Sequence, residues 1–436
     1  MSQKQNSTMP AIVMCVLLFG MISFVTNLAS PMGDVLKYYL AGQEIAIPNW
    51  MATLGVLCNF IAYAVMGIPG GNILQKRGYK YTALLAVAVG FVGVGIQTIA
   101  GLLSGLTAFG VYLLGAFVAG FSMCLLNLVV NPMLNKLGGG GNRSNQLVQI
   151  GASFNSLMGT LVIFLTGVFV PNIVKAQISQ VFPLMFIALA IFAAAFVVIF
   201  FTKIPENPVV EAKAGEKSQY GPLSFRHFVL GAVAIFVYVG IEVGIPNVLQ
   251  KWLQFPGVLG VESGAEAIAG TVTATYWLLM LVGRLLGVAL GAKVSPKAML
   301  SAVSAVGLCL VLGAIFLSPE TVVNLPVFKG TAGFGMATVP VNAALLVLCG
   351  LCTSVMWGGI FNLAVDGLGK YIEKASGIFM ALVCGGGILP LLQNAVVDWT
   401  GGNYLVSYWV IAAGLVYMLY YALIGSKNVN KDIPTE

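Results

Sequence analysis

The residue of this sequence best suited to do chemistry is a glutamate inside an apolar run. Glu242 lies beyond the middle of its run, whereas Asp34, Asp366 and Asp398 are expected toward the ends of theirs. An isolated charge in apolar surroundings is costly, so such a carboxylate either pairs with a basic side chain or has a function. No Lys or Arg is evident at the depth of Glu242. We therefore expect Glu242 to bind a coupling cation or to accept a hydrogen bond from a substrate hydroxyl group.

Carboxamide side chains recur inside other apolar runs. A carboxamide both donates and accepts hydrogen bonds, so several of them around one carboxylate suit an uncharged molecule with many hydroxyl groups. They do not suit a strongly anionic substrate, since no Lys or Arg is expected at mid-membrane. For Asn59 and Asn131 we favour a helix–helix hydrogen bond instead. The candidate substrate-binding amides are Asn27, Asn127, Asn155, Asn362 and Asn394.

Aromatic residues in the same runs could stack on the apolar face of a sugar ring. Trp357 and Tyr276 are the candidates for this role. Packing within the membrane is the alternative for both, because most membrane tryptophans pack or anchor at the interface.

Other potentially reactive residues are interpreted as structural. The seven cysteines lie in apolar runs, and Cys349-x-x-Cys352 has no nearby His, carboxylate or second cysteine pair, so it predicts neither a metal nor a redox site. The only histidine, His227, is expected to be solvated at the start of a helix. No nucleophile–base pair or nucleotide-binding loop is evident, so nothing predicts an enzyme or a bound cofactor.

The composition places these residues in a membrane. Of the 436 residues, 59% are hydrophobic and 8% are charged, and the mean hydropathy is +0.96. An ordinary soluble domain has about a quarter charged residues, so a soluble enzyme is excluded. A spanning helix needs about 20 apolar residues, which leaves room for roughly a dozen. The expected helices are 11–39, 48–74, 81–103, 108–136, 145–170, 182–202, 226–252, 266–291, 297–317, 339–366, 375–398 and 403–425.

The basic residues predict the orientation of these helices. The net charge is +7, and most of the 21 Lys and Arg residues lie in loops on the side of the N-terminus. The loops on the other side hold Lys37, Lys175, Lys251 and Lys329, and Arg284 lies inside a helix. Because basic loops stay on the cytoplasmic side, both termini should be cytoplasmic. The positive charge is then explained by topology and anionic lipid, and no nucleic-acid partner is expected.

The chain divides into two similar halves. A polar stretch from Lys203 to Ser224 separates six helices from six. The segment 27–31 matches 242–246, with coincident prolines, and 131–138 matches 362–369. We therefore expect a six-helix bundle over 1–203, a cytoplasmic linker over 204–224 and a second bundle over 225–436. Paired halves are typical of alternating-access carriers, which hold the substrate between them near the midplane.

Several short segments resemble known transporter motifs. The stretch 70–80 resembles the signature loop of the major facilitator superfamily, with Gln75 in place of the usual aspartate. Other segments, which span nearly the whole chain, resemble the fucose permease and glucose/galactose transporter branch. The resemblance implies an all-α membrane protein with twelve transmembrane helices in two pseudo-symmetric six-helix bundles. The segments are Asn131-Pro132, Ser153-Phe154-Asn155-Ser156, Tyr238-Val239-Gly240-Ile241-Glu242, Gly283-Arg284, Ile360-Phe361-Asn362-Leu363 and Gly385-Gly386-Gly387-Ile388.

Two positions depart from this branch. Its helix 1 carries an acidic residue tied to proton coupling, where this chain has Ser30, and its helix 4 carries Glu or Gln where this chain has Asn127. Glu242 matches a position that is Glu or Gln in the branch. The usual coupling acid is therefore missing, fucose itself is not implied, and Glu242 becomes the leading candidate to bind H+ or Na+.

These observations predict an inner-membrane transporter for a monosaccharide, amino sugar or short oligosaccharide. Symport with H+ or Na+ is the expected mode, and an uncoupled sugar facilitator or an efflux carrier for lipophilic compounds are the alternatives. Lys76, Arg77 and Arg284 are the candidate gate residues. The protein is expected to be a monomer in contact with membrane lipid, without a cofactor or metal.

Overall fold

The computed structural model has the expected membrane-spanning organisation. It describes the whole chain except residues 1, 139–140, 171, 173–174, 177, 203, 205–219, 262–263, 292–293, 330–332, 431 and 435–436. In the described part, twelve helices are long and apolar enough to cross a membrane, as predicted. These spans are Met9–Ala41, Leu54–Leu74, Lys76–Ala100, Gly105–Leu134, Ile150–Phe169, Phe182–Phe201, Arg226–Gln254, Ala265–Gly287, Pro296–Phe316, Val341–Val365, Ala375–Trp399 and Tyr408–Gly425.

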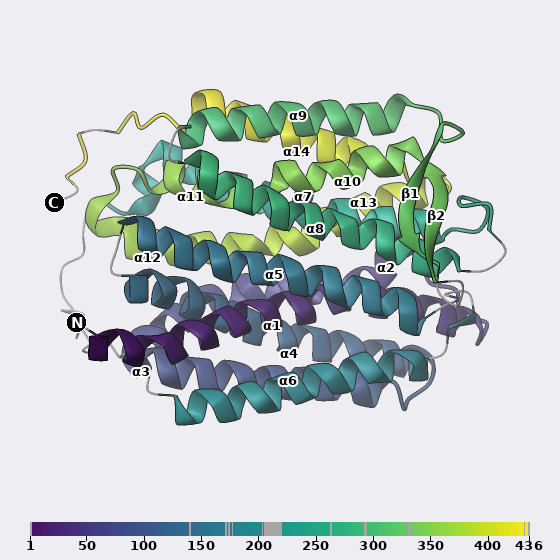
Figure 1. The fold of residues 1–436 in the computed structure, drawn as a ribbon, viewed down its shortest axis with the longest axis horizontal. Coiled ribbons are helices and arrows are strands. Elements are labelled where there is room, and N and C mark those ends of the chain that lie inside the picture. The colour runs from purple at the N-terminus through teal and green to yellow at the C-terminus, as the bar shows by residue number, and fades with distance from the viewer. Residues whose placement is uncertain are drawn as a thin grey trace.

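The helices run side by side along the long axis of the molecule (Figure 1). The first part of the chain forms α1 (Ser2–Ala41), α2 (Asn49–Ala52), α3 (Leu54–Ala100), α4 (Gly105–Gly138), α5 (Gly141–Phe169) and α6 (Phe182–Phe201). The second part forms α7 (Arg226–Gln254), α8 (Ala265–Gly291), α9 (Pro296–Phe316), α10 (Val341–Thr353), α11 (Met356–Val365), α12 (Ile372–Ala381), α13 (Gly385–Trp399) and α14 (Tyr408–Tyr420).

The two groups of helices meet along two seams. The purple-to-blue helices of the first group fill one side of the ribbon, and most of the green-to-yellow helices of the second group fill the other (Figure 1). One seam joins α5 to α8, and the other joins α3 to α12 and α13. Both chain termini lie at one end of the molecule, which we call the terminal end (Figure 1).

A β-hairpin that the sequence analysis did not predict marks the opposite end, which we call the hairpin end (Figure 1). Strands β1 (Val322–Phe328) and β2 (Phe334–Pro340) pair antiparallel, with Val322 opposite Pro340 and Phe328 opposite Phe334. The expected start of the tenth helix at residue 339 was therefore slightly early, because β2 continues to Pro340 before α10 begins.

Four expected helices differ in how they join or continue. The label α3 covers the second and third spans, which are two helices that meet at Gly78, where the backbone is not helical and has a φ of 78° that glycine adopts readily. The expected tenth helix is broken between α10 and α11, and the eleventh contains a 3-10 turn at Leu382–Cys384 between α12 and α13. Such breaks occur in membranes only where the interior of the protein satisfies the backbone, so they point to the protein interior rather than to lipid.

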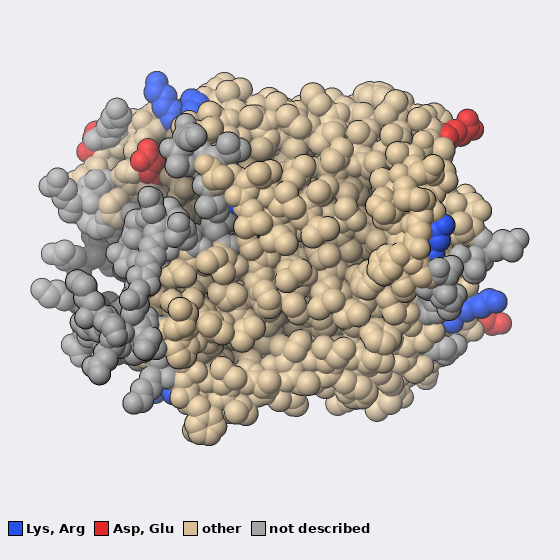
Figure 2. Space-filling view, in the orientation of Figure 1, with Lys and Arg blue, Asp and Glu red and all other residues tan. Residues whose placement is uncertain are grey.

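The surface agrees with a membrane location. Figure 2 shows a broad band without charged side chains on the face in view, with Lys, Arg, Asp and Glu near its two ends. Large apolar side chains such as Phe201, Phe316 and Leu114 are exposed on the helices. In water such a surface would be costly, whereas lipid chains cover it without penalty.

Candidate functional site

The carboxylate of Glu242 is paired with an arginine. Oε1 of Glu242 on α7 lies 3.7 Å from Nη2 of Arg284 on α8, and the two side chains are 13% and 11% exposed. The expectation that no basic residue lies at this depth was therefore wrong. Arg284 lies late in α8, but its long side chain reaches along the bundle to the middle of α7.

Arg284 also connects the two groups of helices. Its Nη1 donates a hydrogen bond to Oγ of Ser156 at 2.8 Å and to the carbonyl oxygen of Ala152, both on α5. The guanidinium group therefore contacts Glu242 through one terminal nitrogen and α5 through the other. Beside the carboxylate lies the hydroxyl group of Tyr238, one turn earlier on α7, which is buried without a hydrogen bond of good geometry.

Three of the predicted amides lie half-buried on the first group of helices. The Asn155 amide nitrogen on α5 donates to the carbonyl oxygen of Phe19 at 2.9 Å. The Asn27 nitrogen on α1 donates to the carbonyl oxygen of Ser23 at 2.9 Å, and that of Asn127 on α4 donates to the hydroxyl of Tyr63 at 2.9 Å. Each amide is thus anchored through its nitrogen while its side chain remains partly accessible.

The fourth amide lies on an open face of α11. Asn362 is exposed, and a Cβ atom added at Gly358, one turn earlier, would have nothing within 4 Å. The other faces of α11 pack on α7 and α9, and Trp357 lies edge-on to Tyr238 and Phe379 at centroid distances of 6.3 and 5.8 Å. Asn362 is therefore accessible on the face that packing leaves uncovered.

The two remaining predicted binding residues, Tyr276 and Asn394, form hydrogen bonds between helices. The Tyr276 ring is fully buried, and its hydroxyl lies 2.9 Å from Oγ1 of Thr353. Asn394 is also fully buried and donates to Oδ1 of Asn247 at 2.9 Å. In this conformation both are separated from solvent.

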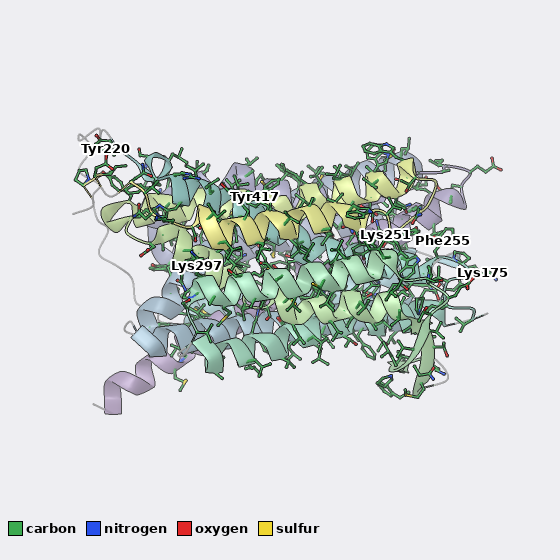
Figure 3. The ribbon with its side chains drawn as sticks, turned by 90° about the horizontal axis from the view of Figure 1, so that it is seen from above. Lys175, Tyr220, Lys251, Phe255, Lys297 and Tyr417 are labelled. Atoms are coloured by element: carbon green, nitrogen blue, oxygen red, sulfur yellow. The ribbon has the colours of Figure 1, made fainter. Side chains whose placement is uncertain are left out.

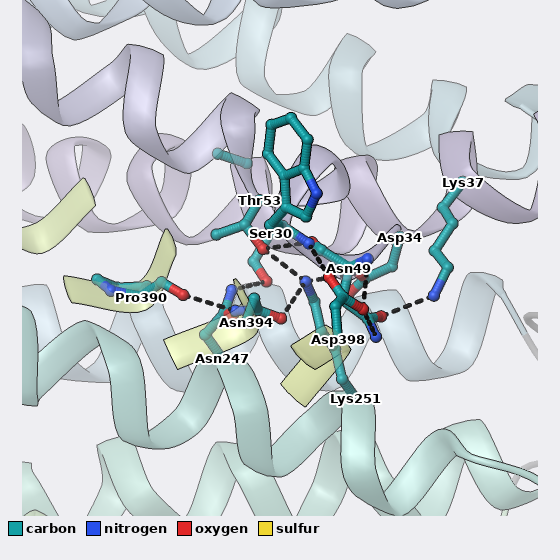
Figure 4. A network of polar contacts seen from close by, with 12 residues as sticks. Ser30, Asp34, Lys37, Asn49, Thr53, Asn247, Lys251, Pro390, Asn394 and Asp398 are labelled. Atoms are coloured by element: carbon teal, nitrogen blue, oxygen red, sulfur yellow. Dashed lines mark hydrogen bonds and ion pairs between the residues drawn. The ribbon is translucent and has the colours of Figure 1, made fainter. Parts of the chain in front are cut away.

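A second buried charge pair, near the hairpin end, was missed by the sequence analysis (Figure 4). Lys251 was expected in a loop and Asp34 near the end of a helix, yet Nζ of Lys251 lies 3.3 Å from Oδ1 of Asp34 and both side chains are buried. Figure 3 shows Lys251 inside the helical region, whereas Lys175 lies at the edge of the molecule. Lys251 lies in the last turn of α7, as the expected helix 226–252 implies, but its side chain is buried against α1 instead of lying at the membrane surface. The spacing from Ser30 to Asp34 equals that from Asn247 to Lys251, but it identifies these partners only once the contact between the two helices is known.

The predicted gate residues of the signature loop lie at the terminal end. Lys76 and Arg77 are exposed on α3, and Arg77 lies over the Tyr81 ring at 5.6 Å. Neither forms an ion pair within the described part of the chain. Their neighbour Lys80 instead donates to the carbonyl oxygens of Phe200 and Thr202, which ties α3 to the end of α6.

Three structural interpretations require correction. His227 is fully buried rather than solvated, because its Nε2 lies 2.8 Å from the carbonyl oxygen of Asp366 beyond α11. Asn131 bonds to the carbonyl oxygen of Asn127 in its own helix, not to another helix. The side chain of Asn59 is buried with no hydrogen-bond partner among the described residues.

Comparison with known proteins defines the class. No family model matches the chain. A glucose/galactose transporter of Brucella abortus is 27% identical over 425 residues, which cover 96% of this chain and 94% of the relative. The L-fucose-proton symporter of Escherichia coli is 22% identical over 430 residues, which cover 92% of this chain and 89% of the relative.

Solved structures agree with these relatives. A crystal structure of the E. coli fucose:proton symporter matches with a TM-score of 0.68 at 18% identity and covers 97% of this chain and 100% of its own. The D-xylose-proton symporter matches with a TM-score of 0.72 at 13% identity and covers 98% and 99%. The chain therefore has the all-α, two-bundle fold of the major facilitator transporters. The predicted resemblance to the fucose permease and glucose/galactose transporter branch is confirmed, and these relatives and neighbours are named as transporters and symporters, not as enzymes.

Proposed function

We propose that this chain is a proton-coupled sugar transporter that works by alternating access. The observation that carries the proposal is a partly accessible Glu242–Arg284 pair in the middle of the bundle, with half-buried amides on neighbouring helices. Relatives over nearly the whole chain are named as transporters of sugars, which supports a sugar as the substrate. They do not favour the alternatives of an efflux carrier or an uncoupled facilitator.

The proposed substrate site combines the accessible polar residues. Asn27, Asn127 and Asn155 would bind sugar hydroxyl groups from one half, and Asn362 from the other. Trp357 offers an aromatic surface beside Asn362. Tyr276 and Asn394 are buried here, so they would reach the substrate only in another conformation of the cycle.

Glu242 is the proposed coupling residue, and H+ is the proposed ion. Relatives and neighbours named as proton symporters support H+, and nothing among them supports Na+. When Glu242 is ionised, Arg284, on the next helix of the same half, neutralises it. Protonation would weaken that attraction and release the guanidinium group, which links the charge of Glu242 to the contact between α5 and α8.

We further propose the arrangement in the cell. Residues 1–203 and 225–436 would rock as two bundles joined by 204–224, in the inner membrane, with both termini in the cytoplasm and the hairpin end outside. Lys76 and Arg77 would then act at the cytoplasmic gate, and Arg284 between the bundles. The protein would function as a monomer surrounded by lipid.

The substrate class can be tested by thermal unfolding of the purified protein with D-glucose, D-galactose, L-fucose and amino sugars. A ligand at 100 times its dissociation constant stabilises the folded state by about 2.7 kcal/mol, so we expect at least one sugar to raise Tm. Asn362→Ala should reduce that shift, because it removes a group that would bind the sugar. Asn72→Ala, a matched control at an exposed position of α3, should leave it unchanged. Stabilisation by lipophilic compounds and by no sugar would contradict the proposal.

A further inference from the structure

The strongest feature outside the proposed sugar site is the environment of Lys251. Besides Asp34, its Nζ donates to Oγ1 of Thr53 at 2.8 Å and to Oδ1 of Asn394 at 3.0 Å. The three protons of the ammonium group therefore have three partners. Two of these partners belong to the first group of helices, although Lys251 itself belongs to the second.

The pair continues a ladder between α1 and α7. One turn before Asp34, Ser30 accepts a hydrogen bond from Asn247 at 2.6 Å, and Asn247 lies one turn before Lys251. Asn394 of α13 connects both rungs, since it accepts from Lys251 and donates to Asn247. The two helices thus face each other through residues at the same four-residue spacing, just after the segments 27–31 and 242–246 that resemble each other in the two halves.

A second contact joins the same two groups of helices nearby. The carboxylate of Asp398, at the end of α13, accepts hydrogen bonds from the backbone N–H groups of Asn49 and Trp50 at 3.1 and 2.9 Å. It also accepts from the side-chain nitrogen of Asn49 at 2.9 Å. Both contacts lie toward the hairpin end, where the short helix α2 begins (Figure 4).

These contacts close the molecule at one end. A buried charge that loses its only counter-charge is strongly unfavourable, whereas a pair that separates into water regains hydration. Lys251 and Asp34 can therefore part only if water enters between α1 and α7. That event would open the space between the two groups of helices toward the hairpin end.

We propose that Lys251 is the gating residue of the transport cycle, and that its ion pair with Asp34 holds the hairpin-end gate shut. This inference rests on the proposed function in assuming a carrier whose halves separate. It assigns a task to two residues that the sugar site does not use. Each transport cycle would break the Asp34–Lys251 pair once and form it again.

The gate can be tested with a reporter cysteine and without any substrate. Thr26→Cys, one turn deeper than Ser30 on α1, would be placed in the full-length protein with the seven native cysteines replaced by Ala. The labelling rate with a membrane-impermeant maleimide, added to the hairpin-end side of reconstituted vesicles, then reports how often that end opens. Lys251→Gln and Asp34→Asn should each raise the rate about tenfold or more, because each leaves an unpaired charge in the closed gate.

The double variant Asp34→Asn/Lys251→Gln removes both charges and should return the rate to within about twofold of the parent. The reversed pair Asp34→Lys/Lys251→Asp should do the same, and it provides a second test if a single variant does not fold. Glu44→Gln is the matched control, since Glu44 is an exposed charge in the segment between α1 and α2. It should leave the rate unchanged.

Unchanged labelling rates in both single variants would contradict the proposed gate. Labelling rates in the double variants as high as in the single variants would also contradict it. Neither result depends on sugar. A parent protein that binds no sugar but shows the expected labelling pattern would instead count against the proposed function alone.

Discussion

Helix α7 carries two charged side chains, Glu242 and Lys251, whose partners lie in different halves of the protein. Glu242 pairs with Arg284 on the next helix of its own half, and that arginine continues to α5. Lys251, near the end of α7, pairs with Asp34 directly across to α1. One charge is therefore partly accessible and suited to binding, whereas the other is sealed and suited to holding two helices together.

The first charge allows a prediction for coupling. Glu242→Gln keeps the shape and polarity of the side chain but cannot carry a proton or a charge. We expect the variant to lose sugar accumulation driven by an imposed pH gradient, while exchange of labelled for unlabelled sugar continues. Uptake and exchange in reconstituted vesicles measure the two activities separately.

Glu320→Gln is the matched control, because Glu320 is exposed just before β1. It should accumulate sugar like the parent protein. Full gradient-driven accumulation by Glu242→Gln would remove Glu242 from the coupling role.

For single residues, the sequence shows which polar side chains lie within the membrane but not which residues they contact. Glu242 and the amides stand out because polar side chains are rare in apolar runs. Lys251 was misassigned because a basic residue near the end of a run is usually at the membrane surface. Its burial depends on Asp34, which lies more than 200 residues away, so no local pattern reveals it.

At the scale of elements, close contact between helices depends on glycine where backbones touch. A Cβ atom at Gly385, the first residue of α13, would overlap the carbonyl oxygen of Phe236 on α7. A Cβ atom at Gly377, on α12, would have nothing within 4 Å. Two helical glycines eight residues apart therefore have opposite packing requirements.

This difference predicts opposite effects of one substitution. Gly385→Ala should destabilise the protein by about 1–3 kcal/mol, because α13 must move away from α7 to admit the methyl group. Gly377→Ala should be neutral or stabilising, since alanine favours a helix by up to about 1 kcal/mol over glycine. Unfolding midpoints in detergent measure both. A smaller loss for Gly385→Ala than for Gly377→Ala would show that the α7–α13 contact is not this close.

Most elements could be predicted from hydrophobic runs alone, because each spanning helix must bury its backbone within one continuous segment. The breaks between α10 and α11 and between α12 and α13 could not, since they are short departures from α-helix inside apolar runs and local hydrogen bonds such as Ser354 N–H to the carbonyl oxygen of Gly350 still satisfy the backbone. The β1–β2 hairpin was missed because its strands are short and include Pro326 and Pro340, which are typical of loops.

At the scale of the whole molecule, polar contacts between the two groups of helices lie toward the hairpin end, whereas other polar residues remain exposed on single helices. The Asp34–Lys251 and Asp398–Asn49 contacts join the halves at that end, while Asn362 remains exposed on α11. This asymmetry fits one state of a carrier that exposes its site to one side at a time.

The central claim is that this fold moves a sugar together with protons, and uptake into reconstituted vesicles tests it most directly. Labelled glucose, galactose and fucose would be offered outside vesicles of the purified protein, with and without an inward proton gradient. We predict that at least one sugar accumulates above its outside concentration only when the gradient is present, and that a proton ionophore abolishes the accumulation. Equal sugar concentrations inside and outside under both conditions, or no uptake of any sugar, would contradict the account.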